Sequence, residues 1–275
     1  MNPNQTICLC RVCGSDANYI FDGEVLGKYV VKYYECNECG YIQTEEPYWL
    51  EHAYRQSITP SDTGIMLRNQ YNARLVLATL YILNNLDGSI VDYAGGYGIL
   101  VRLLRDYGVD ALWSDRYSKN LLASGFEYAS GPAHLVTAFE AFEHFIEPSQ
   151  ELKSLLKISP NVLLSTELVA NQTPAHDAWW YYGSEHGQHI GFFRTKTLEK
   201  MAAQNGKKLI TDGRSYHLFT DQDVDLWKWR VTRKLVSFMP GLISRRLKSK
   251  VWSDHLHFSE KDVRTKMDAN DDTSF

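Results

Sequence analysis

The longest apolar pattern in the chain lies between residues 64 and 86. Apolar residues recur there at helical spacing, three to four positions apart, which predicts one long helix. The residues that carry this spacing are Leu75, Leu77, Ala78, Leu80, Ile82 and Leu83. The following Asp87-Gly88 pair favours a turn and ends the helix.

After this helix, short apolar runs alternate with amphipathic stretches. Strands are predicted over Ser89–Tyr93, Ala111–Ser114, His134–Phe139, Asn161–Thr166 and Lys207–Thr211. Helices are predicted over Gly98–Tyr107, Ser149–Leu156 and Thr197–Ala203. This alternation indicates parallel β-α-β units with helices on both faces of the sheet. The fold class is therefore α/β, with a doubly wound Rossmann-like sheet whose ligands are expected at the carboxyl ends of the strands.

The composition narrows the class of protein. A chain of 275 residues with 44% apolar, 13% aromatic and 23% charged residues is typical of a folded soluble protein and excludes a disordered one. It has no apolar stretch of about 18 residues and no secretory signal, so we expect a cytoplasmic protein. A formal net charge of −4 makes a nucleic-acid partner unlikely for the protein as a whole.

All five cysteines lie within the first 39 residues. Cys10 and Cys13 form one Cys-x-x-Cys pair, and Cys36 and Cys39 form another. Two such pairs supply four thiolates to a tetrahedral structural zinc ion. Disulfides are the alternative, which the absence of an export signal disfavours, and a redox-active pair is another. Cys8 remains as a bystander or a substitute ligand.

The composition also divides the chain into four regions. Residues 27–36 between the cysteine pairs alternate like a strand, which predicts a small zinc ribbon at the N-terminus. We expect a zinc-binding module over 1–46, a helical linker and helix over 47–86, a Rossmann-like domain over 87–225, and a basic extension with a polar, frayed tail over 226–275.

The first predicted strand of the sheet leads into a glycine-dense turn and then a helix. Glycines let the backbone approach a ligand, and a helix N-terminus offers free N–H groups. The spacing fails the dinucleotide fingerprint, because its third small residue would fall on Val101 or Ile99. What fits is Asp-x-Ala-x-Gly-x-Gly, from Asp92 to Gly98. A plain tight turn remains the alternative.

The next strand ends at Asp115, which lies 23 residues after Asp92. The two oxygens of a carboxylate at this place match the vicinal hydroxyls of a ribose. An aspartate that caps the N-terminus of a helix would look the same in the sequence.

Together these motifs resemble class I S-adenosylmethionine-dependent methyltransferases over roughly residues 64 to 220. Ala94 replaces the first glycine of that family's first motif, a tolerable change if its dihedral angles are ordinary. Residues 123–127 resemble the segment near the adenine, and Glu143-His144 with Pro148 resembles the signature after the fourth strand, although these two residues could be purely structural. The resemblance implies S-adenosylmethionine as cofactor and assigns its contacts to Asp92, Ala94, Gly95, Gly96, Gly98, Asp115, Phe126, Phe139 and Glu140.

The stretch from Trp179 to Phe193 crowds aromatic residues, two histidines and a carboxylate into one loop. Aromatic faces with a few polar groups suit a sugar-like substrate. With the cysteine module, the loop resembles zinc-containing sugar C-methyltransferases and their shorter relatives. In those enzymes a Glu-His pair precedes a short aromatic run and the histidine is the proposed base. Here His189 is kept and Gln188 replaces the glutamate.

Methyl transfer requires a group that removes a proton from the acceptor, and a neutral histidine suits that task. The predicted general base is His189, with His186 of the Glu185-His186 pair second. Tyr181 or Tyr182 is expected to orient the substrate. The alternative is that both histidines only hydrogen-bond the loop.

The segment Leu226–Trp252 contains eight basic residues and no acidic one. Such a stretch is predicted either to contact an anionic partner or to be a solvated face that packs against acidic residues of the same chain. The basic residues are Lys228, Arg230, Arg233, Lys234, Arg245, Arg246, Lys248 and Lys250.

The sequence thus predicts a methyltransferase that acts on a small acceptor, sugar-like or linked to a nucleotide, in glycan or secondary-metabolite biosynthesis. Two alternatives remain open. One is a zinc-bearing RNA methyltransferase, and the other is a non-catalytic scaffold that retains the fold.

Overall fold

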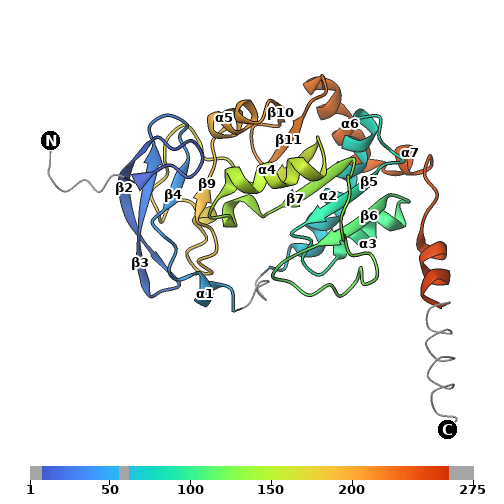
Figure 1. Ribbon diagram of the computed structural model, residues 1–275, viewed down its shortest axis with the longest axis horizontal. Helices are drawn as coiled ribbons and strands as arrows, with labels where there is room; N and C mark the ends of the chain where they lie inside the picture. Colours follow the sequence, from blue (N-terminus) through green and yellow to red (C-terminus); the bar gives the residue numbers. More distant parts are fainter. Residues whose placement is uncertain (1–7, 56–61, 260–275) are drawn as a thin grey trace, which may run out of the picture.

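Two β-sheets organise the chain, a small one near the N-terminus and a large one in the middle of the molecule (Figure 1). The computed structural model describes residues 8–55 and 62–259. The small sheet lies at one end of an elongated molecule, and the last described residues lie at the other end. The small sheet is built mainly from the first 44 residues, and the large sheet from residues 89–220.

The small sheet is antiparallel, with the order β1-β2-β3-β4-β9. Its strands are β1 (Cys8–Leu9), β2 (Asp16–Val25), β3 (Tyr29–Cys36), β4 (Ile42–Thr44) and β9 (Gly191–Phe192). A turn in which Leu26 and Gly27 have positive φ joins β2 to β3, as tight hairpins require. Four strands come from the first 44 residues, whereas β9 comes from far along the chain.

The large sheet has the order β10-β11-β8-β7-β5-β6. Its strands are β5 (Ser89–Tyr93), β6 (Asp110–Ser114), β7 (Leu135–Phe139), β8 (Val162–Ser165), β10 (Lys208–Thr211) and β11 (Tyr216–Thr220). The four strands from β5 to β8 are parallel, as predicted. The sequence analysis did not predict β11, which runs antiparallel to both β8 and β10, so the sheet is mixed.

The antiparallel edge arises from a hairpin that the sequence analysis missed. The Asp212 Oδ1 accepts hydrogen bonds from the backbone N–H groups of Arg214, Ser215 and Tyr216, and Gly213 has a positive φ. This turn reverses the chain within a few residues, so no helix crosses over between β10 and β11.

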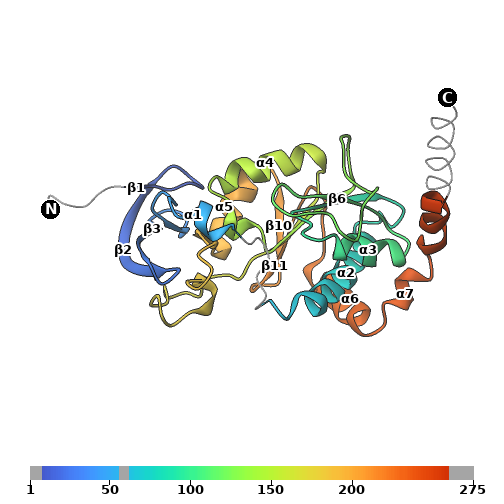
Figure 2. The same ribbon diagram turned by 90° about the horizontal axis from the view of Figure 1, so that it is seen from below.

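Helices cover both faces of the large sheet, which explains why its strands are apolar on both sides (Figure 2). One face packs against α2 (Ile65–Ile82), α3 (Ile99–Asp106) and α6 (Leu226–Phe238). The other face packs against α4 (Pro148–Ile158) and α5 (Thr195–Gln204). Successive strand residues alternate between the two cores: Ile90 and Leu135 face the first group, and Val91 and Val136 face the second.

The remaining helices are short. They are α1 (Leu50–Ala53), α7 (Gly241–Ser244) and the 3-10 helices η1 (Phe142–His144) and η2 (Trp180–Tyr182). Residues 251–259 are also helical. In the described ranges, no helix combines the length and the apolar character that crossing a bilayer requires.

The beginning of the basic C-terminal segment belongs to the core of the large domain. Trp229 of α6 is fully buried, and its Nε1 donates to Thr79 Oγ1 of α2 at 3.3 Å. Arg233 pairs with Asp212 at 3.0 Å. Asp254 lies farther along and accepts two hydrogen bonds from the Arg105 guanidinium, each at 2.8 Å. The polar tail that we expected to fray lies mostly beyond residue 259, outside the described residues.

Hydrogen bonds hold the N-terminal module against the large domain. Strand β4 pairs with β9, with Ile42 opposite Phe192. The Ser149 hydroxyl of α4 donates to the Val12 carbonyl at 3.0 Å, and the Thr197 hydroxyl of α5 donates to the Cys39 carbonyl at 2.8 Å. The N-terminal module and the α/β domain therefore share a hydrogen-bonded interface.

Replacing Gly191 with alanine should destabilise the protein by about 1–3 kcal/mol, the usual cost of overpacking a core. A Cβ at this position would lie 1.9 Å from the Tyr41 hydroxyl, and Tyr41 is fully buried. Urea unfolding of Gly191→Ala should show the loss. In the control Gly241→Ala, only the Arg245 Nε lies near, at 3.9 Å, so stability should stay nearly unchanged. Equal stability of the two variants would mean that β9 is not held against Tyr41.

Candidate functional site

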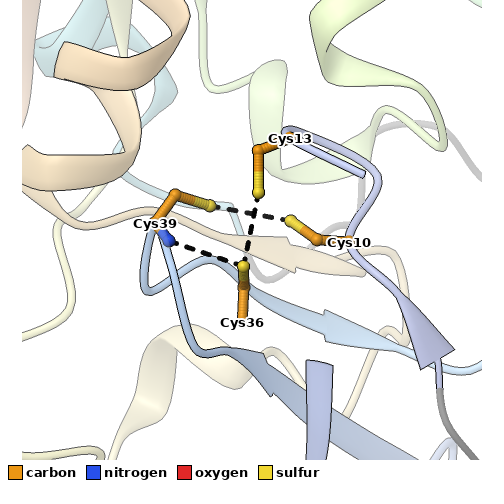
Figure 3. A group of neighbouring side chains, drawn as sticks. All are labelled: Cys10, Cys13, Cys36 and Cys39. Carbon is orange, nitrogen blue, oxygen red and sulfur yellow. Dashed lines mark hydrogen bonds between the residues drawn. The ribbon is translucent and has the colours of Figure 1, made fainter. Parts of the chain in front are cut away.

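The four cysteines of the two Cys-x-x-Cys pairs converge on one point (Figure 3). Their sulfur atoms all lie within 4.8 Å of one another. The Cys10 and Cys39 sulfurs are 3.6 Å apart, and those of Cys13 and Cys36 are 3.4 Å apart. Four sulfurs bound tetrahedrally to zinc at about 2.3 Å would be separated by about 3.8 Å. The cluster therefore has nearly the dimensions of a tetrahedral zinc site.

The surroundings of the cluster suit thiolates. The backbone N–H groups of Val12 and Cys39 point at the Cys10 and Cys36 sulfurs, each at 3.4 Å. A hydrogen bond from the Cys39 thiol lowers the pKa of Cys10 to about 5. Cys8 is not a member of the cluster, and its sulfur accepts a hydrogen bond from Gln43 Nε2 at 3.0 Å. The donor set thus fits a closed structural zinc ion, with Cys8 as a bystander.

A cavity of about 1840 Å³ opens at the carboxyl ends of β5, β6 and β7. Its opposite wall is formed by the loop from His176 to His189 and by α1. Most of the predicted site residues line this cavity: Asp92, Ala94, Gly95, Gly96, Asp115, Phe139, Glu140, Glu185, His186 and His189. The strand ends at which the sequence analysis expected a ligand therefore border this cavity.

Three of the predicted residues lie elsewhere. The Phe126 ring packs beneath the Arg105 guanidinium, whose carbon is 3.6 Å from the ring centroid, and does not line the cavity. Tyr182 is buried among aromatic rings and donates its hydroxyl to the Pro174 carbonyl at 3.0 Å. Gly98 has a φ of 82°, and a Cβ there would lie 2.9 Å from the Ala123 Cβ. Gly98 therefore allows close packing against Ala123, and Tyr182 is part of the hydrophobic core.

Asp92 is a buried carboxyl at the end of β5. It is 3% exposed, and its Oδ1 accepts a hydrogen bond from the Thr137 hydroxyl at 2.7 Å. Burial raises the pKa of Asp92 to about 7, and the Thr137 hydrogen bond opposes the shift only in part. This carboxyl lines the cavity, so a cationic ligand there would favour its ionised form.

Ala94 does not have the ordinary dihedral angles that would make the replacement of glycine free of strain. Its φ is 62°, in the left-handed region that glycine adopts most easily. The turn therefore keeps the conformation of a glycine at this position, and the alanine carries backbone strain of about 1 kcal/mol. Glu140, which follows β7, also has a positive φ, of 50°. Both strained residues line the cavity.

Asp115 connects the glycine turn to the segment that follows β6. Its Oδ2 accepts a hydrogen bond from the Gly96 N–H at 2.9 Å, and its Oδ1 accepts two, from Tyr117 and Ser118, each at 2.7 Å. No helix follows among these described residues, so Asp115 caps a turn rather than a helix. A carboxylate offers about four acceptor positions. Within residues 8–55 and 62–259, the turn uses three of them and leaves the last on Oδ2.

Three histidine rings cluster on the opposite wall. The rings of His144 and His189 lie 4.9 Å apart, and those of His186 and His189 lie 4.7 Å apart. Burial lowers the pKa of His189 well below its usual value, and burial with the nearby His186 lowers that of His144 to about 4. The three imidazoles are therefore neutral at pH 7.

The hydrogen bonds of two rings determine their tautomers. The His189 Nδ1 lies 2.6 Å from the Tyr181 carbonyl, which can only accept, so Nδ1 carries the proton and Nε2 keeps a lone pair. In His186 the Nδ1 accepts from the Gln188 N–H at 3.1 Å, so its proton is on Nε2. His189 therefore offers a basic nitrogen, whereas His186 offers a donor.

Two residues of this wall were missed or left undecided by the sequence analysis. Tyr54 lines the cavity and stacks on Tyr117, with ring centroids 5.3 Å apart. Tyr54 belongs to the segment that we interpreted as a linker, and the aromatic residues of that segment could have indicated a binding site. Glu143, left open between a functional and a structural role, has no exposed surface, and burial raises its pKa to about 8.

A family model described as a methyltransferase domain matches residues 67–211. Curated proteins give no match. Among solved structures, the chain is similar to TnmH, with 15% identity, a TM-score of 0.44, and coverage of 64% of this chain and 62% of that chain.

It is also similar to magnesium protoporphyrin IX methyltransferase from Synechocystis PCC 6803, with 16% identity, a TM-score of 0.41, and coverage of 62% of this chain and 90% of that chain. A third structure is CalO1, a methyltransferase in calicheamicin biosynthesis, with 14% identity, a TM-score of 0.37 and 54% coverage of each chain. The chain thus spans about half the length of CalO1.

Replacing Cys36 with serine should remove the zinc ion, because the site needs all four thiolates for a closed tetrahedron. Protein dialysed against a weak chelator should contain about one zinc per chain by mass spectrometry, and Cys36→Ser should contain almost none. Cys8→Ser is the matched control and should keep its zinc. Equal zinc contents in Cys36→Ser and the unaltered protein would exclude this cluster as the binding site.

Replacing Ala94 with glycine should stabilise the protein by about 1 kcal/mol, because glycine adopts a positive φ without the clash of a Cβ. Thermal unfolding would measure the gain. Ala129→Gly is the control: Ala129 is exposed and has no positive φ, so glycine there should lower the stability. A loss of stability in both variants would show that Ala94 is not strained.

Proposed function

The chain belongs to the family of S-adenosylmethionine-dependent methyltransferase domains, and from this premise we propose that it methylates a small, sugar-like or nucleotide-linked acceptor in glycan or secondary-metabolite biosynthesis. The observation that carries the proposal is the single cavity between the glycine turn and the histidine cluster. One wall has the groups that a nucleoside cofactor needs, and the other has a neutral base beside aromatic rings.

The glycine-turn wall fits S-adenosylmethionine. At Gly95 a Cβ would lie 2.7 Å from Trp113 and 3.0 Å from the Asp92 carboxyl, so the backbone itself forms the wall there. Asp115 keeps one acceptor position on Oδ2 for a ribose hydroxyl, and Asp92 provides a buried carboxyl for a cationic group. Phe139 and Glu140 complete this wall. These residues would hold the cofactor, which supplies an activated methyl group when bound.

The histidine wall provides the group that removes a proton. His189 Nε2 has a free lone pair, because Nδ1 donates to the Tyr181 carbonyl. In the proposed reaction this nitrogen takes the proton of the acceptor as its nucleophilic atom attacks the methyl carbon. His186 holds its proton on Nε2 and would donate a hydrogen bond to the acceptor. The tautomers thus favour His189 over His186 as the base.

Aromatic side chains on the same wall favour a sugar-like acceptor. Trp180 lines the cavity with 78% of its surface exposed, and Trp179 and Tyr181 lie beside it. Exposed aromatic faces stack on the apolar faces of sugar rings, while nearby polar groups bind their hydroxyls. Both Tyr181 and Tyr182 are 1% exposed, but only Tyr181 lines the cavity, so we assign to Tyr181 the orienting role that the sequence left open between the two tyrosines.

The basic segment gives little support to the RNA alternative. Arg233 is paired with Asp212, and Lys250 lies 3.9 Å from Asp110, so part of the positive charge is neutralised within the chain. An anionic partner for the remaining basic residues and a cytoplasmic location stay predictions from the sequence.

Replacing His189 with alanine should reduce turnover by about 100- to 10,000-fold and leave cofactor affinity nearly unchanged, because the base contacts the acceptor rather than the cofactor. Calorimetric titration with S-adenosylmethionine would measure binding. Formation of S-adenosylhomocysteine with a panel of nucleotide sugars would measure turnover. His186→Ala should lose less activity, and His255→Ala, far along the C-terminal helix, should behave like the unaltered protein.

Two outcomes would contradict the proposal in different ways. Full activity of His189→Ala would exclude this residue as the base but keep the enzyme. Absence of S-adenosylmethionine binding by folded, zinc-loaded protein would overturn the methyltransferase function and favour the scaffold.

A further inference from the structure

Glu143 is a buried carboxyl. It lies in η1, no part of its side chain is exposed, and neither carboxylate oxygen makes a hydrogen bond of normal geometry among the described residues, although the nearby Tyr181 and Thr166 hydroxyls act to lower its pKa. Burial disfavours the ionised form of such a carboxyl, so a cation beside it would be needed to hold it as a carboxylate. No lysine or arginine lies within ion-pair distance of Glu143 in the described ranges. The proposed methyl transfer gives this carboxyl no role.

Two histidines face the same point. One ligand atom of Glu143, one of His144 and one of His189 all lie within 4.8 Å of one another. The His144 Nε2 is 4.0 Å from the Glu143 Oε1, which is too far for a hydrogen bond. No side-chain hydrogen bond is formed between Glu143 and either histidine in the described residues.

The orientation of both imidazoles is the one that metal-binding histidines adopt. The Nδ1 of His144 donates to the Gln188 carbonyl at 3.1 Å, and the Nδ1 of His189 donates to the Tyr181 carbonyl at 2.6 Å. Histidines that bind a metal ion through one nitrogen usually donate the other N–H to a carbonyl or carboxylate. Each ring therefore keeps a lone pair on Nε2, directed away from the backbone that holds it.

We propose that Glu143, His144 and His189 bind a first-row divalent cation, such as Zn²⁺ or Co²⁺, at the wall of the cavity. Two imidazoles and one carboxylate form a donor set that suits these ions. Three protein ligands leave at least one coordination position open, and His144 and His189 both line the cavity. This site is separate from the cysteine cluster, whose four thiolates leave no open position.

The distances permit such an ion after small movements. A cation equidistant from three atoms that are 4.8 Å apart would lie about 2.8 Å from each, against about 2.1 Å in a formed site. Each side chain would thus move by less than about 1 Å. His144 and His189 are anchored through Nδ1, so Glu143 would supply much of the adjustment.

The catalytic role of this ion rests on the proposed methyl transfer and would replace the role of His189 as general base, whereas the binding of the ion rests on neither. The lone pair of His189 cannot hold both a proton and a metal ion. In the ion-bound state, His189 would be a ligand, and a hydroxyl of the acceptor in the open position would become more acidic through coordination. The released proton would then pass to solvent in the cavity.

The test is a titration of the zinc-loaded protein with Co²⁺. The full chain should bind one additional ion, with the weak visible absorption of nitrogen and oxygen ligands and without the intense band of cobalt thiolates. Glu143→Gln keeps the size of the side chain and should weaken binding at least tenfold, as should His144→Gln. Glu140→Gln is the matched control, because it removes a carboxylate from the same cavity and should change the affinity less than threefold.

Three outcomes would overturn the site: no additional Co²⁺, a thiolate-type spectrum, or equal affinity in folded Glu143→Gln and the unaltered protein. Circular dichroism would confirm that each variant is folded. Titration with S-adenosylmethionine in parallel separates the two proposals. Cobalt binding without cofactor binding would refute the methyltransferase function alone, and cofactor binding without cobalt binding would refute the metal site alone.

Discussion

The cavity depends on the pairing of β4 with β9. These strands come from opposite halves of the chain, and their short ladder places the loop of residues 176–190 against the ends of the parallel strands. Two further hydrogen bonds strengthen this contact. Trp49 Nε1 donates to the Gly187 carbonyl at 2.8 Å, and the Thr44 N–H donates to the Ile190 carbonyl at 3.0 Å. The N-terminal module thus forms the support of one wall of the site.

This support explains why the histidine cluster can be rigid although it lies in a loop. The carbonyls of Tyr181 and Gln188 that orient His189 and His144 belong to a backbone held by the small sheet. Groups placed by rigid elements are positioned more accurately than groups on free loops. The cysteine cluster stabilises the turns of that sheet, so it affects the proposed chemistry without touching a substrate.

The sequence predicted the large domain well where local pattern and tertiary structure agree. Strand β5 was predicted at its observed bounds, and the strand-end rule located the glycine turn and Asp115 at the cavity. Prediction from the sequence failed where contacts between distant parts of the chain determine the structure. The two-residue β9 exists only because β4 pairs with it, and β11 follows a turn rather than a helix. The predictions for Phe126 and Tyr182 failed for a similar reason. The sequence alone does not show whether an aromatic side chain contacts a ligand or packs in the core.

The position of β9 also affects the order in which the molecule can assemble. During synthesis the first 44 residues emerge early, yet the edge strand that completes their sheet emerges only with residues 191–192. Until then, β4 presents an open edge with unpaired backbone groups. A contact across so long a stretch of chain is slow to form, since the intervening loop must first be closed at an entropic cost. The N-terminal sheet, although four of its strands are synthesised before the large domain, is therefore among the last parts of this chain to reach its final form.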